Sequence, residues 1–435
     1  MNRKRNRGMA CLAFVVWLLA TALTAYGQGH TWIGEGLTRM VERARWRIGL
    51  LRVNAAFTLA DAGYDSDVYY GYLQSGQVPD WTFAASTPVQ LLVPLGKKVV
   101  LDLSDTPQYL FYLDTDKERA WNNTFRGQLY VALEKIYVQA GGDMADVRRR
   151  FGPELDINVR ERRDSLDGLV FWQVAKTTAF AVLYERTRIE YEDIEYAGTS
   201  LANRLNRDED LLDGIFYVQP GPRWRPFLDG QYGVFTFTGE PSGLRDAKSY
   251  GIFGGVEFAP ETEEAEARTS IRGAFRLGYR RLDIADPGQP DGSGFSGKAD
   301  VTVNLTRKTS IHGLFSRGFE FSVYSGAVYY LSTSYGGGLL QRLSQRISLS
   351  YEVSFGRLSY PESTDVQARL DRYAAHMMSL EFRLGRHVEA ALSGTLNRRR
   401  LGAEAPPRDR YFVGFSLIYG SRGRDLTPPL IGLIR

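Results

Sequence analysis

The four histidines are the first residues to consider for chemistry, because they are few and widely separated: His30, His312, His376 and His387. None forms an H-x-x-x-H or H-E-x-x-H pair of the kind that binds a metal ion. Ser393, His387 and Glu389 combine a nucleophile, a base and a carboxylate, but a strand advances about 3.4 Å per residue, which places Ser393 about 20 Å from His387. We therefore expect no catalytic residue, no metal site and no cofactor.

Charged residues on the polar face of the expected strands are the residues that could act on a solute. We predict that they line a pore: Arg126, Arg272, Arg276, Arg280, Lys298, Asp300, Arg346, Glu352, Glu381, Arg383 and Glu389. Arg272, Arg276 and Arg280 would stack along one wall, an arrangement suited to anionic solutes or acidic sugars. An alternative stays open, in which these arginines only pair with carboxylates on neighbouring strands and stiffen the wall.

The elements that carry these residues read as β-strands. Apolar and polar residues alternate from Trp121 to Glu134 and again from Arg346 to Leu358, as in a sheet with two different faces. The chain of 435 residues has 25 Tyr and 23 Phe but no long apolar run after the first residues, so a membrane-spanning form must be a closed sheet. The pattern predicts an all-β, transmembrane, antiparallel up-and-down β-barrel of about 18 strands, with 16 also possible, over residues 49–420.

Connector lengths support a barrel rather than a soluble sandwich, because short and long connectors alternate. The short ones lie at 96–98, 134–135, 176–177, 306–308, 344–346 and 385–386, with a longer acidic one at 259–267. The long ones are 61–80, 114–119, 148–164, 191–210, 239–249, 283–294, 361–372 and 399–410. Outer-membrane barrels have short periplasmic turns and long outer loops. An even strand count would leave both ends in the periplasm.

The first residues predict secretion. Arg3, Lys4, Arg5 and Arg7 precede an apolar stretch over 9–23 and then Ala25-Tyr26-Gly27, so we expect a signal peptide over 1–27 that is cleaved before Gln28, with Ala20-Thr21-Ala22 as a second site. The apolar stretch is short for a membrane anchor, the alternative. The sole cysteine, Cys11, lies inside this segment. Residues 28–48 are expected to be a periplasmic lead-in that includes a short amphipathic helix over 34–46, with Leu37, Met40 and Val41 on one side.

The last expected strand resembles an assembly signal. Tyr411, Val413, Phe415, Leu417 and Tyr419 share one face, and the spacing of Gly414, Leu417 and Tyr419 resembles the C-terminal motif by which the insertion machinery recognises outer-membrane barrels. Here the chain continues past the terminal aromatic residue, and residues 421–435 would form a periplasmic tail.

A motif in the first long loop resembles a known family. The segment Gly63-Tyr64-Asp65-Ser66-Asp67-Val68-Tyr69-Tyr70 is similar to the one that follows the first strand in the putative β-barrel porin type 2 family. Its members are outer-membrane barrels of Gram-negative bacteria, often associated with exopolysaccharide systems. The resemblance implies the location and the architecture, together with passage of a solute or of an envelope polysaccharide.

These observations predict an outer-membrane channel, porin-like, that passes small polar solutes or assists envelope polysaccharide export. The alternative is a structural or interaction barrel with a closed lumen whose loops bind a partner. Expected partners are outer-membrane lipid and lipopolysaccharide, the barrel-insertion machinery, and polysaccharide or small polar solutes. Part of the formal charge of +4 lies in the first residues, and no basic stripe with interleaved aromatic residues indicates a nucleic-acid partner.

Overall fold

We describe the protein from a computed structural model. The structure describes residues 37, 40–42, 44–69, 76–150, 152–154, 157–196, 198–219, 224–239, 243–258, 271–324, 326–362, 369–402 and 406–420. The expected signal peptide, the acidic connector 259–267 and the expected tail 421–435 lie outside these residues. Among the residues described, no helix is long and apolar enough to cross a membrane.

The described chain is almost entirely strand. The first half contains β1 (Trp46–Ile48), β2 (Leu51–Asp65), β3 (Asp80–Ser86), β4 (Val89–Leu95), β5 (Val99–Tyr112), β6 (Ala120–Ala132), β7 (Ile136–Arg150), β8 (Asn158–Ala175), β9 (Thr178–Tyr191), β10 (Glu195–Tyr196), β11 (Thr199–Ser200) and β12 (Arg207–Val218). The second half contains β13 (Trp224–Phe237), β14 (Ala247–Phe258), β15 (Ile271–Ile284), β16 (Gly292–Asn304), β17 (Thr309–Phe321), β18 (Tyr329–Arg342), β19 (Ile347–Tyr360), β20 (Arg369–Arg383), β21 (Val388–Arg400) and β22 (Arg408–Gly420). Two short helices, η1 (Asp116–Glu118) and α3 (Leu201–Leu205), lie in connectors.

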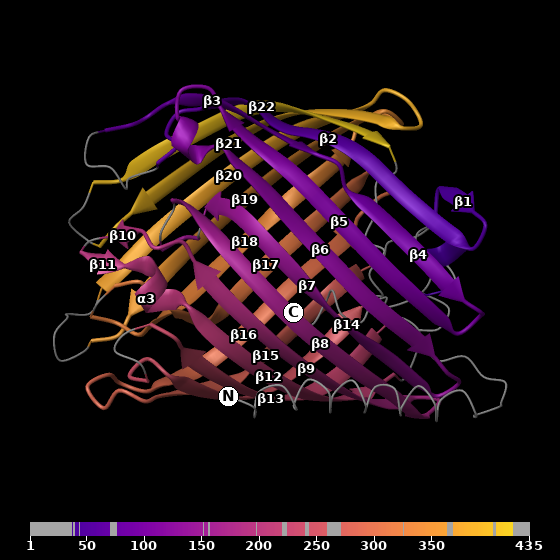
Figure 1. Cartoon of the computed structure of the whole chain (residues 1–435), viewed down its shortest axis with the longest axis horizontal. Coiled ribbons are helices and arrows are strands. Elements are labelled where there is room, and N and C mark those ends of the chain that lie inside the picture. The colour runs from indigo at the N-terminus through magenta and orange to yellow at the C-terminus, as the bar shows by residue number, and fades with distance from the viewer. Residues whose placement is uncertain are drawn as a thin grey trace, which may run out of the picture.

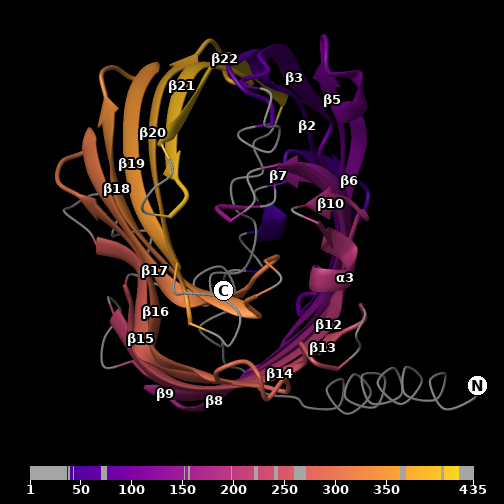
Figure 2. The same cartoon turned by 90° about the vertical axis from the view of Figure 1, so that its left-hand side faces the viewer.

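The strands close into one antiparallel barrel of 18 strands, which confirms the predicted fold class. Neighbouring strands of the ring follow one another along the chain, with β12 next to β9 because β10 and β11 form a separate hairpin, and β22 pairs with β2 to complete the ring seen in Figure 2. β3 and β4 are two parts of one strand, because both pair with β2 and both pair with β5. A closed barrel leaves no unpaired strand edge, and this satisfies the backbone inside a membrane.

Short turns and long connectors lie at opposite ends of the barrel. Figure 1 shows the turn after β4 at one end, here named the short-turn end, and α3 with the hairpin β10–β11 at the other, the long-loop end. The predicted connectors that the structure describes lie at gaps between strands, but several long ones are shorter than predicted, because β8 already begins at Asn158 and β12 at Arg207. The structure adds two connectors that the sequence pattern missed, residues 219–223 between β12 and β13 and Ser322–Val328 between β17 and β18.

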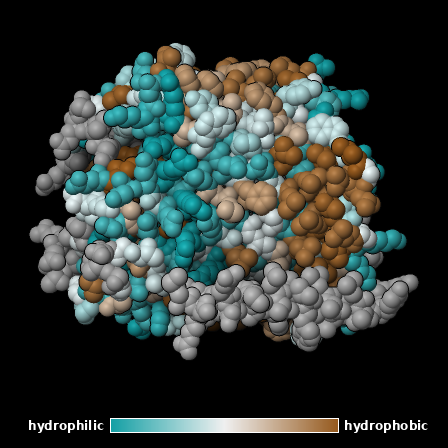
Figure 3. Space-filling model, in the orientation of Figure 1, coloured by the Kyte–Doolittle hydropathy of each residue, from teal (hydrophilic) through white to brown (hydrophobic). Residues whose placement is uncertain are grey.

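The two faces of the strands differ as the alternation predicted. On β6, Trp121 and Phe125 are exposed on the outer surface, whereas Gln128 and Tyr130 face the interior and are buried. Figure 3 shows apolar side chains gathered toward the short-turn end of one face, with polar side chains over the rest of it. An apolar outer band with a polar interior is the pattern of a barrel in lipid.

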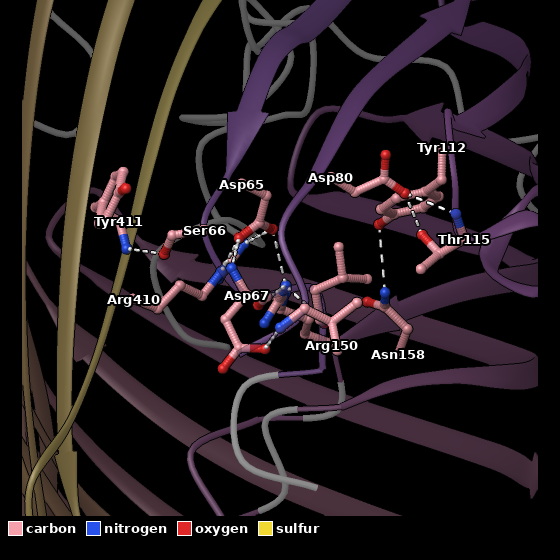
Figure 4. A network of polar contacts seen from close by, with 12 residues as sticks. Asp65, Ser66, Asp67, Asp80, Tyr112, Thr115, Arg150, Asn158, Arg410 and Tyr411 are labelled. Carbon is pink, nitrogen blue, oxygen red and sulfur yellow. Dashed lines mark hydrogen bonds and ion pairs between the residues drawn. The ribbon is translucent and has the colours of Figure 1, made fainter. Parts of the chain in front are cut away.

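Near the long-loop end, the seam between the first and last strands is held by the motif that resembled a family signature (Figure 4). The Arg410 guanidinium donates two hydrogen bonds to the Asp65 carboxylate, at 2.7 and 2.6 Å, and Arg150 donates a third at 3.1 Å. The Ser66 hydroxyl accepts the backbone N–H of Tyr411 at 2.9 Å. The motif thus joins the first strand of the barrel to the last strand and to β7.

The same seam contains two residues with a geometric requirement. A Cβ atom at Gly63 would lie 2.1 Å from the Val413 carbonyl oxygen, so only glycine fits where β2 approaches β22. Asp61 adopts a positive φ of 51° at a bulge in β2. In the expected assembly signal, Gly414 pairs with Gly63, while Leu417 and Tyr419 lie on the outer face of β22.

Candidate pore and its constriction

Ten of the eleven residues predicted to line a pore lie on inward faces of the strands. Directly paired residues point to the same side of a sheet, and the register links Arg272 through Thr302, His312 and Gly338 to Glu352. The remaining residue, Arg346, does not lie on a strand. It lies in the turn before β19 and is exposed at the short-turn end.

Water reaches one sector of the inner wall, from β16 to β21. The inward side chain of Asp300 is 52% exposed and that of Arg383 is 55% exposed. Lys298 and Glu352 are exposed as well. The Nε2 atom of His312 and a carboxylate oxygen of Asp300 lie 2.9 Å apart, within hydrogen-bonding distance. This sector therefore presents charges of both signs to the lumen.

Another sector of the inner wall, on β13 and β14, is buried. On β13 and β14, the Arg225 Nε donates to the Glu257 carboxylate at 2.7 Å, and both side chains have no exposure. The Arg225 guanidinium also lies over the Tyr217 ring, 5.0 Å from its centroid. Neither residue was predicted as a site residue, because an arginine and a glutamate 32 positions apart carry no local signal. The barrel register brings them directly opposite each other.

Two arginines of the expected ladder, Arg276 and Arg280, bind side chains of the barrel wall. Arg276 donates to the Asp229 carboxylate at 3.0 Å and Arg280 to the Gln231 side chain at 2.7 Å, each reaching from β15 across β14 to β13. The crossing is possible because β14 has glycines at the paired positions Gly255 and Gly251. Arg276 is therefore paired with a carboxylate, as in the alternative considered from the sequence, but the partner lies two strands away and not on a neighbouring strand.

Connectors from opposite walls meet over the long-loop end. We call the described residues of Ser322–Val328 the crossing loop. Arg204 in α3 donates to the Tyr324 carbonyl oxygen at 2.5 Å, and Arg245, from the β13–β14 connector, donates to the Ser322 and Val328 carbonyl oxygens at 2.6 and 3.2 Å. These contacts tie the crossing loop to connectors several strands away around the ring.

Glu154 fixes the crossing loop to the β7–β8 connector. Its carboxylate accepts the Ser322 hydroxyl at 2.6 Å and the Val323 backbone N–H at 3.0 Å, and its own backbone carbonyl accepts a hydrogen bond from Arg399. Glu154 has no exposure. Burial raises the pKa of this carboxyl to about 7, against the lowering effects of its hydrogen bonds and of Arg399.

A small apolar core supports this bridge. It contains residues of the β7–β8 and β9–β12 connectors, of the strands beside them and of the crossing loop: Ile157, Val159, Ile189, Tyr191, Leu201, Leu205 and Val323. Val323 reaches it from across the barrel. The long-loop mouth is thus bridged by packed side chains as well as by polar contacts, and this narrows the entrance to the lumen.

Known proteins give the following similarities. A family model described as "Putative beta-barrel porin 2" matches residues 168–405. OccAB4 of Acinetobacter baumannii has a TM-score of 0.48 at 11% identity, over 85% of this chain and 98% of that one. OccK3 (OpdO) of Pseudomonas aeruginosa has a TM-score of 0.46 at 11% identity, over 89% and 98%. No curated protein matches the sequence.

Proposed function

Because the chain belongs to the Putative beta-barrel porin 2 family, we propose that it is a porin-like channel of the outer membrane that passes small polar solutes through its lumen. The short-turn end would face the periplasm and the long-loop end the outside. A channel, rather than an enzyme, fits this family.

The observation that carries the proposal is the water-exposed, charged inner face of β16–β21. Lys298, Asp300, Glu352 and Arg383 face the lumen without being packed against an apolar core. Barrels of this size enclose an aqueous space. Charges of both signs favour hydrated polar solutes without strong selection for one sign.

The bridged long-loop mouth favours small solutes over a polymer. The crossing loop is held to connectors on the other side of the barrel by Glu154, Arg204 and Arg245. A polysaccharide chain would have to break these contacts to pass, whereas a small solute could pass beside them. Assistance in exopolysaccharide export therefore remains the second candidate, supported by the family resemblance.

Planar bilayer recording tests the channel. We expect discrete conductance steps, and we expect Arg383→Glu to shift the reversal potential in a salt gradient toward cation preference, because it replaces an exposed positive charge in the lumen. Arg281→Glu is the matched control, since Arg281 is equally exposed but lies on the outer face of β15. A protein that shows no conductance, although electrophoresis before and after heating shows that it is folded, would instead support the closed structural barrel.

Export and insertion complete the proposal. We propose cleavage before Gln28, so intact-mass measurement of outer-membrane protein should give a chain that begins there. Gly414, Leu417 and Tyr419 are proposed to be read by the insertion machinery. The apolar outer band would contact lipid and lipopolysaccharide.

A further inference from the structure

One part of the inner wall is apolar, which is unusual for a surface that faces a lumen. Inward residues near the short-turn end of β5–β9, β12 and β13 form a continuous cluster, here named the inner apolar wall: Val100, Tyr130, Tyr137, Leu169, Phe171, Ala179, Ala181, Leu183, Ile215, Tyr217 and Phe227. Tyr130, Tyr137, Phe171 and Tyr217 have no exposure at all. Water in the lumen does not reach them.

Residues before the first barrel strand belong to the same cluster. Leu37, Met40 and Ala44 are 4%, 4% and 6% exposed and pack with the inner apolar wall, and Val41 packs at its margin. Glu42, on the same segment, is exposed. The segment therefore presents its apolar side to the wall and its polar side away from it, as an amphipathic helix would.

The position of this segment is set by the strand that follows it. β1 pairs with the start of β2 through Ile48↔Leu51 at the short-turn end. The backbone N–H of Arg45 donates to the Asn54 side chain, which faces inward, at 3.0 Å. These contacts turn the chain back from β2 into the mouth of the barrel.

The packing leaves polar groups unsatisfied. The hydroxyl oxygens of Tyr130 and Tyr217 are buried without a hydrogen-bond partner. Burying a hydroxyl without a partner costs free energy that contact with water would recover. Contact of the inner apolar wall with water would therefore supply partners to these two hydroxyls, and this favours displacement of whatever covers the wall.

We propose that the segment carrying Leu37, Met40 and Ala44 is a displaceable plug, docked on the inner apolar wall, that obstructs this side of the lumen at the short-turn end. The proposal goes beyond solute passage, because it assigns the inner apolar wall an occupant from the chain itself. Displacement of the plug would expose the buried aromatic side chains to water.

Chemical labelling tests docking without relying on conductance. Cys11 is the only cysteine, so Cys11→Ser gives a background in which Ala181→Cys reports on a buried position of the inner apolar wall, in the cluster that includes Leu37 and Met40. We expect a water-soluble maleimide to label this cysteine at least about tenfold faster when Leu37→Asp and Met40→Asp are added, because two charges cannot stay in an apolar contact.

Two controls make the result decisive. Asp300→Cys, on the water-exposed sector β16–β21 of the inner wall, should be labelled at the same rate with and without the plug substitutions. Glu42→Gln, on the exposed side of the segment, should leave the labelling of Ala181→Cys slow. Equal labelling rates for Ala181→Cys with and without the plug substitutions would overturn the proposal, provided that electrophoresis before and after heating shows both proteins to be folded.

Single-channel recording then measures the closure. Leu37→Asp with Met40→Asp should raise conductance about 1.5-fold, because the inner apolar wall occupies β5–β9, β12 and β13, seven of the 18 strands of the ring. Unchanged conductance with fast labelling would mean that the segment docks without closing the lumen, and it would overturn the plug while leaving the proposed channel intact.

Discussion

Glu154 shows how one buried side chain can control an entrance. Its carboxyl joins the β7–β8 connector to the crossing loop, and it is surrounded by Ser322, Tyr360 and Arg399, with Arg204 and Arg245 nearby. The pKa is raised from its ordinary value of 4.5 to about 7 by burial. The buried site therefore favours the neutral acid.

The sign of the resulting pH dependence follows from this raised pKa. The bridge is most stable below the ordinary pKa and loses stability as pH rises through about 7, because the closed form binds the proton more tightly. We expect higher conductance at about pH 8 than at about pH 5, and we expect Glu154→Gln, which stays neutral, to remove this difference. A pH dependence that persists in Glu154→Gln would contradict the assignment.

The buried pair Arg225–Glu257 illustrates a different effect at the same scale. Arg225→Ala would leave the Glu257 carboxylate buried without its partner, and we expect a loss of about 3–5 kcal/mol in the free energy of unfolding. Replacing both residues, by Arg225→Met and Glu257→Leu, should recover most of that loss. Urea unfolding of the protein in lipid vesicles measures both, and equal losses for the single and double variants would argue against the pair.

At the scale of the element, the seam between β2 and β22 depends on a few residues. Asp65 is the common acceptor for Arg410 and Arg150, so it connects three strands. Asp65→Ala should lower the free energy of unfolding by about 3 kcal/mol, because two partly buried guanidinium groups lose their carboxylate.

A matched control for the seam exists on the outer surface. Asp409 pairs with Arg398, both well exposed, and Asp409→Ala should cost no more than about 1 kcal/mol. The temperature at which the folded band disappears in heat-shift electrophoresis measures both variants. Similar shifts for Asp65→Ala and Asp409→Ala would show that the seam needs no buried acceptor.

At the scale of the whole molecule, the crossing loop joins the two walls of the barrel. Its contacts come from three connectors that are distant in the sequence. Replacing residues 322–328 by a short Gly-Ser turn should raise conductance and let larger sugars enter in liposome-swelling assays, since this loop receives contacts from three connectors of the other wall. An unchanged size limit would place the narrowest part elsewhere, for example at the proposed plug.

The predicted barrel agrees with the structure where the local pattern carried enough information. Strands such as β6 and β19 alternate cleanly, and their outward and inward residues lie as expected. The connector after β17 was missed, because Ser322–Val328 contains apolar residues that resemble a continuing strand. Arg346 was assigned to a strand that begins one residue later.

The sequence alone determined the two-faced strands, their even number and the barrel, since a side-chain period of two and alternating connector lengths are local properties. Only the tertiary structure decided what occupies the lumen. The bridge through Glu154, the Arg225–Glu257 pair and the packing of Leu37 on the inner apolar wall each join residues on different strands or connectors. Such contacts depend on how the ring closes and how the chain folds into it, and no local period encodes either.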